Sequence, residues 1–223
     1  MSGLLLDVVA TTVEDVQACH AGGADCVELA VDLDSLGRTP PLELVGAACS
    51  VSDIEIRVML RSGPGPLSAR ALDEQLDVAR RIASLPVGGL VFGFLTPEGL
   101  LDLVTARAVA EAIAPLPWTL HRAFDQAGCP GLDDLESFGL DRVLSAGGPG
   151  SLDDHRAATE RRAAVGLLPR RMIAAGRARL DHVRWATELG MAGIHVGDAV
   201  RDSWTTPVDP RRVEAFRLAI DRL

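Results

Sequence analysis

The sequence has few of the residues that nucleic-acid-binding proteins use. It contains no tyrosine, and aromatic residues make up only 4% of its 223 residues, so aromatic platforms for stacking bases are not expected. Basic residues are also in deficit, since the formal net charge is −9. A surface that binds nucleic acid or an anionic membrane needs a basic patch. The charge balance therefore predicts neither partner, although it is compatible with a local basic pocket.

Cysteine and long apolar segments are equally scarce. The four cysteines form no C-x-x-C pair, a spacing that fits neither a zinc finger nor a disulfide framework. This usage predicts a reducing compartment, the cytoplasm, in which most thiols are small buried hydrophobic groups. No apolar run approaches the roughly 18 residues of a membrane-spanning helix, and the N-terminus lacks the basic region of a signal peptide. We expect no membrane partner.

What the sequence does contain is a repeated unit, in which a helical pattern ends at glycine and a short β-rich run follows. The unit begins at Gly22, Gly88, Gly139 and Gly190. Glycine after a helix accepts the left-handed conformation that ends it. Filling the gaps between these points gives eight candidate strands, at 4–9, 26–31, 54–60, 90–94, 118–122, 142–146, 171–175 and 193–196.

Helical patterns lie between these strands. Strict alternation of strand and helix implies parallel strands with right-handed crossovers, and eight such units close a TIM barrel. We therefore predict a single-domain α/β TIM (β/α)8 barrel over residues 1–223. An open doubly wound sheet is the alternative, but no G-x-G-x-x-G follows the first strand and no P-loop is present. The helical patterns include 12–21, 69–85, 105–114, 133–138, 152–163, 180–189 and 210–223.

The carboxyl ends of the predicted strands gather most of the candidate functional side chains. In a barrel, active groups lie at these ends, and several of these residues have the parity of inward-facing positions. The fifth strand also runs into a charged cluster, His-Arg-x-x-Asp. Together these positions predict a catalytic set on one cavity rim, made of Asp7, Glu28, Arg61, His121, Arg122, Asp125 and His195.

Purely structural roles are the alternative for the same side chains. Ion pairs between arginine and carboxylate are common in protein structures, and a buried histidine or a turn-capping serine needs no catalytic role. Such roles would account for Asp7, Glu28, Arg61, His121, Arg122, Asp125, Ser145 and His195 alike. Elsewhere, we expect His20, His155 and His182 at the surface on helical stretches, and Asp141 and Arg142 in solvent at a strand start.

Two loops late in the chain are suited to hold an anion. The run at 145–151, Ser-Ala-Gly-Gly-Pro-Gly-Ser, starts at a serine with inward parity and leads into a helix. Backbone N–H groups at such a turn favour phosphate or carboxylate. The run at 175–179 places Arg177 and Arg179 at the next strand end, where barrel enzymes often bind phosphate. We assign the binding of such a group to Ser145, Gly147, Gly148 and Gly176.

Five blocks of sequence carry a more specific signal. They are GGADCVEL at 22–29, GRTPPL at 37–42, VFGFLTPEG at 91–99, HRAFD at 121–125 and LDRVLSAG at 140–147. On these residues the chain resembles the CutC family, the copper-homeostasis proteins. The resemblance runs in order from about Leu6 to His195. It implies a TIM barrel, a cytoplasmic location and a role in handling copper.

Three departures from the family pattern affect what this resemblance implies. Ala30 stands where the family has a cysteine proposed for copper. The residues after Arg61 and the run at 176–179 also differ from the family's glycine-containing loops. Copper(I) favours soft thiolate or thioether ligands, so the loss of this cysteine weakens the case for copper. Cys129, on the loop after His121, is the thiol expected near the mouth.

Metal handling is the first of two functions that the residues allow. In this hypothesis a copper ion is held at the mouth by His121, His195, Glu28 and Cys129. The family resemblance favours it.

An enzyme acting on a small anionic substrate is the second. Arg61 and Arg122 would hold a carboxylate or phosphate, while Glu28 or Asp7 acts as base and His121 as acid, which requires pKa values pushed apart. Two arginines at one mouth repel a bare cation, so the residues themselves favour an anion. A barrel retained as a partner-binding scaffold, or assembled as a homodimer, is a third interpretation.

Overall fold

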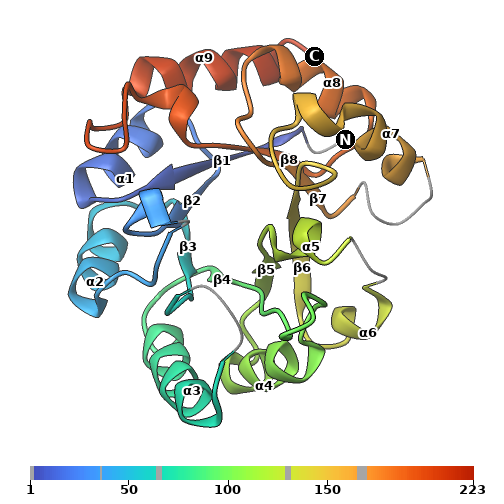
Figure 1. The fold of residues 1–223 in the computed structure, drawn as a ribbon. Coiled ribbons are helices and arrows are strands. Elements are labelled where there is room, and N and C mark those ends of the chain that lie inside the picture. The colour runs from blue at the N-terminus through green and yellow to red at the C-terminus, as the bar shows by residue number, and fades with distance from the viewer. Residues whose placement is uncertain (1–2, 36, 64–66, 129–131, 165–169) are drawn as a thin grey trace.

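The structure, a computed structural model, is a closed barrel of eight parallel strands inside a ring of helices (Figure 1). It describes residues 3–35, 37–63, 67–128, 132–164 and 170–223. Each strand pairs with the next and the last pairs with the first, which closes the barrel and confirms the predicted TIM fold. The strands are β1 (Leu5–Ala10), β2 (Cys26–Leu29), β3 (Glu55–Met59), β4 (Gly89–Phe92), β5 (Trp118–Leu120), β6 (Leu140–Ser145), β7 (Met172–Ala174) and β8 (Gly193–Val196).

Helices surround the strands, and several start at caps that the sequence supplies (Figure 1). Thr12, Ser68 and Asp102 each accept a hydrogen bond from the backbone N–H three residues on, which satisfies a donor that the first turn leaves free. Among the described residues, no helix combines the length and apolar character needed to span a bilayer. The α-helices are α1 (Val13–Ala21), α2 (Leu42–Val51), α3 (Ala69–Ala83), α4 (Leu103–Ile113), α5 (Ala123–Gln126), α6 (Asp133–Glu136), α7 (Arg156–Ala163), α8 (Asp181–Glu188) and α9 (Pro210–Asp221), and the 3-10 helices are η1 (Leu33–Ser35), η2 (Asp153–His155) and η3 (Asp198–Val200).

Strand parity separates two layers of packing. Side chains that face the helices form the large core, which on β1 includes Leu6 and Val8. Side chains that face the barrel axis form a smaller apolar cluster, because successive residues of a strand point to opposite faces. The buried members of this inner cluster are Ala30, Met59, Val91, Leu144, Ile173 and Ala175.

An ionic network, not predicted from the sequence, occupies the amino-terminal end of the barrel interior. Buried Arg57 on β3 donates to both carboxylate oxygens of Asp141 at 2.6 Å and to Glu55 at 2.7 Å. Arg142 in turn donates to Glu55 at 3.0 Å. Arg142, whose side chain is 17% exposed, does not have the solvent position that we expected, whereas Asp141 remains 37% exposed. Asp141 also pairs with the buried Arg57 guanidinium, which needs carboxylate partners. With this end filled, the site lies at the other end.

The position of His182 also differs from the prediction. We expected a surface residue, but its side chain is buried. Its Nδ1 accepts from the Arg179 backbone N–H at 3.0 Å, and its Nε2 lies 3.0 Å from the Asp153 carboxylate. His20 is exposed as predicted, and His155 is half-buried.

Candidate functional site

A cavity of about 510 Å³ opens at the carboxyl ends of the strands. Its lining comes from strand ends and loops far apart in the sequence, which the barrel brings together. Asp7 lies on β1, where it binds His195, and the other six members of the predicted catalytic set line the cavity. Those six are Glu28, Arg61, His121, Arg122, Asp125 and His195.

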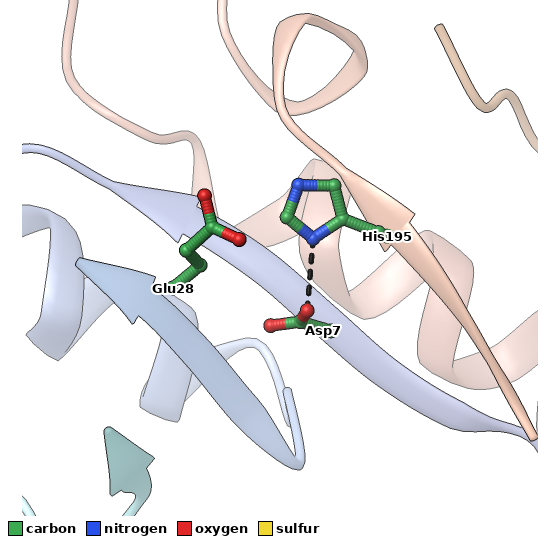
Figure 2. A group of neighbouring side chains, drawn as sticks. All are labelled: Asp7, Glu28 and His195. Carbon is green, nitrogen blue, oxygen red and sulfur yellow. Dashed lines mark hydrogen bonds and ion pairs between the residues drawn. The ribbon is translucent and has the colours of Figure 1, made fainter. Parts of the chain in front are cut away.

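Asp7, Glu28 and His195 form a compact group in this region (Figure 2). Asp7 and His195 are register partners on the adjacent strands β1 and β8, and the Asp7 carboxylate lies 2.8 Å from His195 Nδ1. Glu28 extends from β2 toward the same point (Figure 2). One ligand atom from each side chain lies within 4.8 Å of those of the other two.

Burial and charge separate the proton affinities of this group. Burial acts to lower the pKa of His195, but the carboxylates of Asp7 and Glu28 outweigh it and raise that pKa to about 9. Burial raises the pKa of Glu28, and His195 offsets only part of this increase. His195 is therefore an imidazolium at neutral pH, and Glu28 is a stronger base than an exposed glutamate.

His121 follows β5 and, unlike His195, is neutral. Burial, reinforced by the Arg61 guanidinium, lowers the pKa of His121 well below its usual value. Its Nδ1 accepts a hydrogen bond from the Ala123 backbone N–H at 3.1 Å, so the ring proton lies on Nε2. This bond also explains why α5 begins at Ala123, where we expected a strand end and a loop. A neutral His121 can donate a hydrogen bond through its Nε2–H, and the acid role that we expected for it stays a prediction.

Asp125 anchors the loops on one side of the cavity. Its buried carboxylate accepts from the Arg122 Nε at 2.9 Å, from the Ser145 hydroxyl at 2.5 Å and from the Ala146 backbone N–H at 2.9 Å. Arg122 donates further to the Gly148 carbonyl at 2.8 Å. The ion pair between Arg122 and Asp125, one of our alternatives, is present. It fixes the guanidinium at the cavity wall.

The glycine-rich loop supports Arg122. The backbone N–H of Gly147 donates to Ser145 Oγ at 3.0 Å, so this amide is occupied by an internal bond. A Cβ on Gly176 would lie only 2.9 Å from Arg122 Nη1. Ser145 does not have the inward position that we expected, because Leu144 lines the cavity and Ser145 turns toward Asp125.

Several lining residues were missed from the sequence. Met59 shares the inward parity of Arg61, a signal that we did not use. Asp198 and Trp204 come from the segment after β8, where no strand pattern predicts the direction of a side chain. Cys129, assigned as a metal ligand from the sequence, lies outside the described residues.

Comparison with known proteins assigns the family. A model of the CutC family matches residues 4–167, which is most of the chain. The chain belongs to the CutC family. The matched segment ends before β7, so His195 lies outside it.

Individual CutC proteins show the same relationship. The copper homeostasis protein cutC homolog of Homo sapiens is 34% identical over 66% of this chain and 55% of its own length. A CutC family protein of Parabacteroides distasonis is 34% identical over 64% of this chain and 61% of its own length. The chain thus matches less than two thirds of the length of these relatives. The crystal structure of a putative copper homeostasis protein CutC from Streptococcus agalactiae superposes with a TM-score of 0.76 at 21% identity, covering 87% of this chain and 98% of that chain.

The donor set in the barrel fits some metal ions better than others. Asp7, Glu28 and His195 offer carboxylate and imidazole donors, which suit harder divalent ions, whereas copper(I) prefers sulfur. Burial raises the pKa of Cys26 well above its usual value, so this thiol resists forming the thiolate that binds metal. The three donors Asp7, Glu28 and His195 therefore include no sulfur ligand of the kind that copper(I) prefers.

Proposed function

We propose that the barrel mouth is an acid–base site for a small molecule that carries a carboxylate or phosphate. One observation carries the proposal. Asp7 Oδ1, Glu28 Oε2 and His121 Nε2 are buried polar atoms that have no hydrogen-bond partner in the described part of the chain. Buried polar groups are normally paired, and two of these residues line a cavity together with Arg61 and Arg122. A bound ligand would supply the missing partners.

Each side chain has a role that its environment supports. Arg61 and Arg122 hold the anionic group, because guanidinium matches carboxylate and phosphate geometry. Glu28 takes a proton from the substrate, and its raised pKa makes it a stronger base. The His195 imidazolium, positioned by Asp7, returns a proton as the acid. The neutral His121 donates its Nε2–H to a developing oxyanion.

The separation of pKa values favours this chemistry over a structural role alone. Acid and base partners can be recognised as titratable groups whose environments push their pKa values apart. Here one histidine is held charged and the other neutral, although both lie at strand ends in the same cavity. The arginine beside His121 and the carboxylates beside His195 cause the difference.

A divalent metal ion is a second candidate ligand, favoured by the three clustered donors Asp7, Glu28 and His195. Membership of the CutC family links the chain to copper homeostasis at the family level. For a metal to bind, His195 must first lose its proton, so metal binding would release protons and weaken at low pH. The arginines at the mouth oppose a bare cation. We therefore rank this second to the anion.

Calorimetric titration separates the two functions. We expect inorganic phosphate or acetate to bind at one site, and Arg122→Ala to weaken this binding by about tenfold or more, because a charge-assisted hydrogen bond contributes about 1.5–3 kcal/mol. Arg70→Ala removes an exposed arginine on α3 that pairs with Glu74, and this control should bind like the wild type.

Copper(II) is the competing titrant. Stoichiometric copper binding that is lost in His195→Ala, together with no binding of either anion, would replace our proposal with a metal site.

A further inference from the structure

A second cavity, of about 620 Å³, adjoins the barrel mouth. It lies between the loop after β7, η3 and α9, so it is outside the barrel. Leu180, Ala199 and Phe216 give it apolar walls, and Arg179 and Arg212 lie at its edge. No residue of the proposed acid–base set belongs to it.

Arg177 lies at the junction of the two cavities and lines both. It follows Gly176, whose backbone lies against Arg122, so two guanidinium-bearing residues flank one glycine at the rim. Arg177 has a φ of +54° and is one of two non-glycine residues with positive φ in the described part of the chain. The left-handed region disfavours side chains with a Cβ, so a glycine would be the less strained residue here.

The charge of Arg177 is also not neutralised by a neighbour. Arg179 pairs with Asp153 at 2.7 Å and Arg212 pairs with Asp202 at 2.5 Å. None of the residues that the structure describes forms a hydrogen bond or an ion pair with Arg177. Asp198 lines both cavities too, so an anion reaching Arg177 must avoid that carboxylate, which restricts where it can bind.

We propose that Arg177 binds a second anionic group of the ligand. The ligand class is then a small molecule with two anionic groups, either a dicarboxylate or a phosphorylated carboxylic acid. One group is held in the mouth by Arg61 and Arg122, and the other lies at the rim on Arg177. This inference rests on the proposed function, since it needs the mouth to bind an anion.

Matched ligands test the inference by calorimetry on the full chain. Acetate and inorganic phosphate carry one anionic group, whereas succinate and 2-phosphoglycolate carry two. We expect the two-group ligands to bind the wild type about tenfold or more tightly than the one-group ligands. Arg177→Gly should abolish this difference and leave the binding of the one-group ligands unchanged. Arg177→Lys should restore part of it.

Two controls make the result specific. Glycine suits the positive φ at this position, so Arg177→Gly should unfold at a temperature no lower than that of the wild type. Arg179→Ala changes an arginine that lines only the second cavity, and it should keep the preference for two groups.

The outcomes distinguish the two proposals. In one outcome, the one-group ligands bind and their binding depends on Arg122, but the two-group ligands bind no more tightly or Arg177→Gly has no effect. This outcome would refute the role of Arg177 and leave the proposed function standing. A preference lost equally in Arg179→Ala would place the second group inside the second cavity and also refute it. No binding of any of the four ligands would refute the proposed function itself.

Discussion

His195 and His121 show how strongly a single residue depends on its neighbours. Both histidines belong to the barrel mouth, yet carboxylates surround one and an arginine lies beside the other. The sequence alone could identify both histidines as candidate site residues, because strand parity places both at inward positions. Their charge states could not, because these depend on distances between strands that are far apart in the chain.

The charged state of His195 predicts a pH dependence of stability. Its pKa is about 9 in the folded protein, against 6.5 as its ordinary value. Because the folded pKa is raised, the stabilisation is complete below pH 6.5 and is lost as pH rises through about 9. A shift of this size corresponds to about 3 kcal/mol. Urea unfolding at intervals from pH 6 to pH 9.5 should show the decrease.

Asp7→Asn tests the cause of this dependence. Removing the carboxylate should lower the pKa of His195 and remove most of the decrease between pH 6.5 and pH 9. His20→Ala changes an exposed histidine and should leave it intact. An unchanged profile in Asp7→Asn would show that the Asp7–His195 pair is not its source.

His121 should behave in the opposite way. We expect its ring to be neutral at pH 6.5, the ordinary pKa of histidine, with the proton on Nε2, because burial and Arg61 disfavour the charged form. Nitrogen chemical shifts of the imidazole ring report the tautomer directly. Arg61→Ala should raise the pKa of His121. Titration of wild-type His121 near pH 6.5 would contradict the assigned role as a neutral donor.

At the scale of elements, strand parity predicted the inward residues where the pairing is regular, and it failed where pairing shifts. The predicted 193–196 strand agrees with β8 at both ends. Between β5 and β6 the register shifts at Trp118 and Thr119, and a one-residue slip reverses which side chains face inward. The alternation of apolar and polar residues therefore cannot predict the inward position of Leu144. Nor can it predict the α5 turn, which the His121 ring caps.

Asp125 links these elements, and its loss should be costly. It joins α5 to the end of β6 through hydrogen bonds from Ser145 and Ala146, and it accepts a third from Arg122, just before α5. Asp125→Ala leaves buried donors unsatisfied, and we expect it to lower the free energy of unfolding by about 3 kcal/mol or more. Arg122→Ala should cost less, because the side chain of Arg122 is 31% exposed and Asp125 keeps its other donors. Urea unfolding compares the two variants, and an equal loss in both would contradict this ranking.

At the scale of the whole molecule, a buried ion pair joins the segment after β8 to the first helix, α1. Arg201 donates to Asp15 at 3.2 Å and to the Val9 carbonyl at 2.5 Å, and both charged side chains are buried. Asp15 also accepts from the Val208 backbone N–H at 2.9 Å. No sequence pattern indicates this pair, since its members lie 186 positions apart.

Breaking this pair should destabilise the entire barrel. We expect Arg201→Ala to lower the free energy of unfolding by about 3–5 kcal/mol, because it leaves the buried Asp15 carboxylate without its cation. Arg211→Ala removes an arginine from an exposed pair with Asp209 and should change the free energy of unfolding far less, because solvent screens such pairs. Equal effects of the two variants in chemical denaturation would show that the buried pair contributes no more than the exposed one.

The pairing of β1 with β8 determines when the Asp7–His195 pair can form during synthesis. Asp7 and His195 are separated by 188 positions and meet only across this seam. A nascent chain whose β8 has not yet emerged from the ribosome has the Asp7 carboxylate but lacks the His195 imidazolium that pairs with it. A fragment that lacks either strand would lack this pair, and with it the acid of the proposed chemistry.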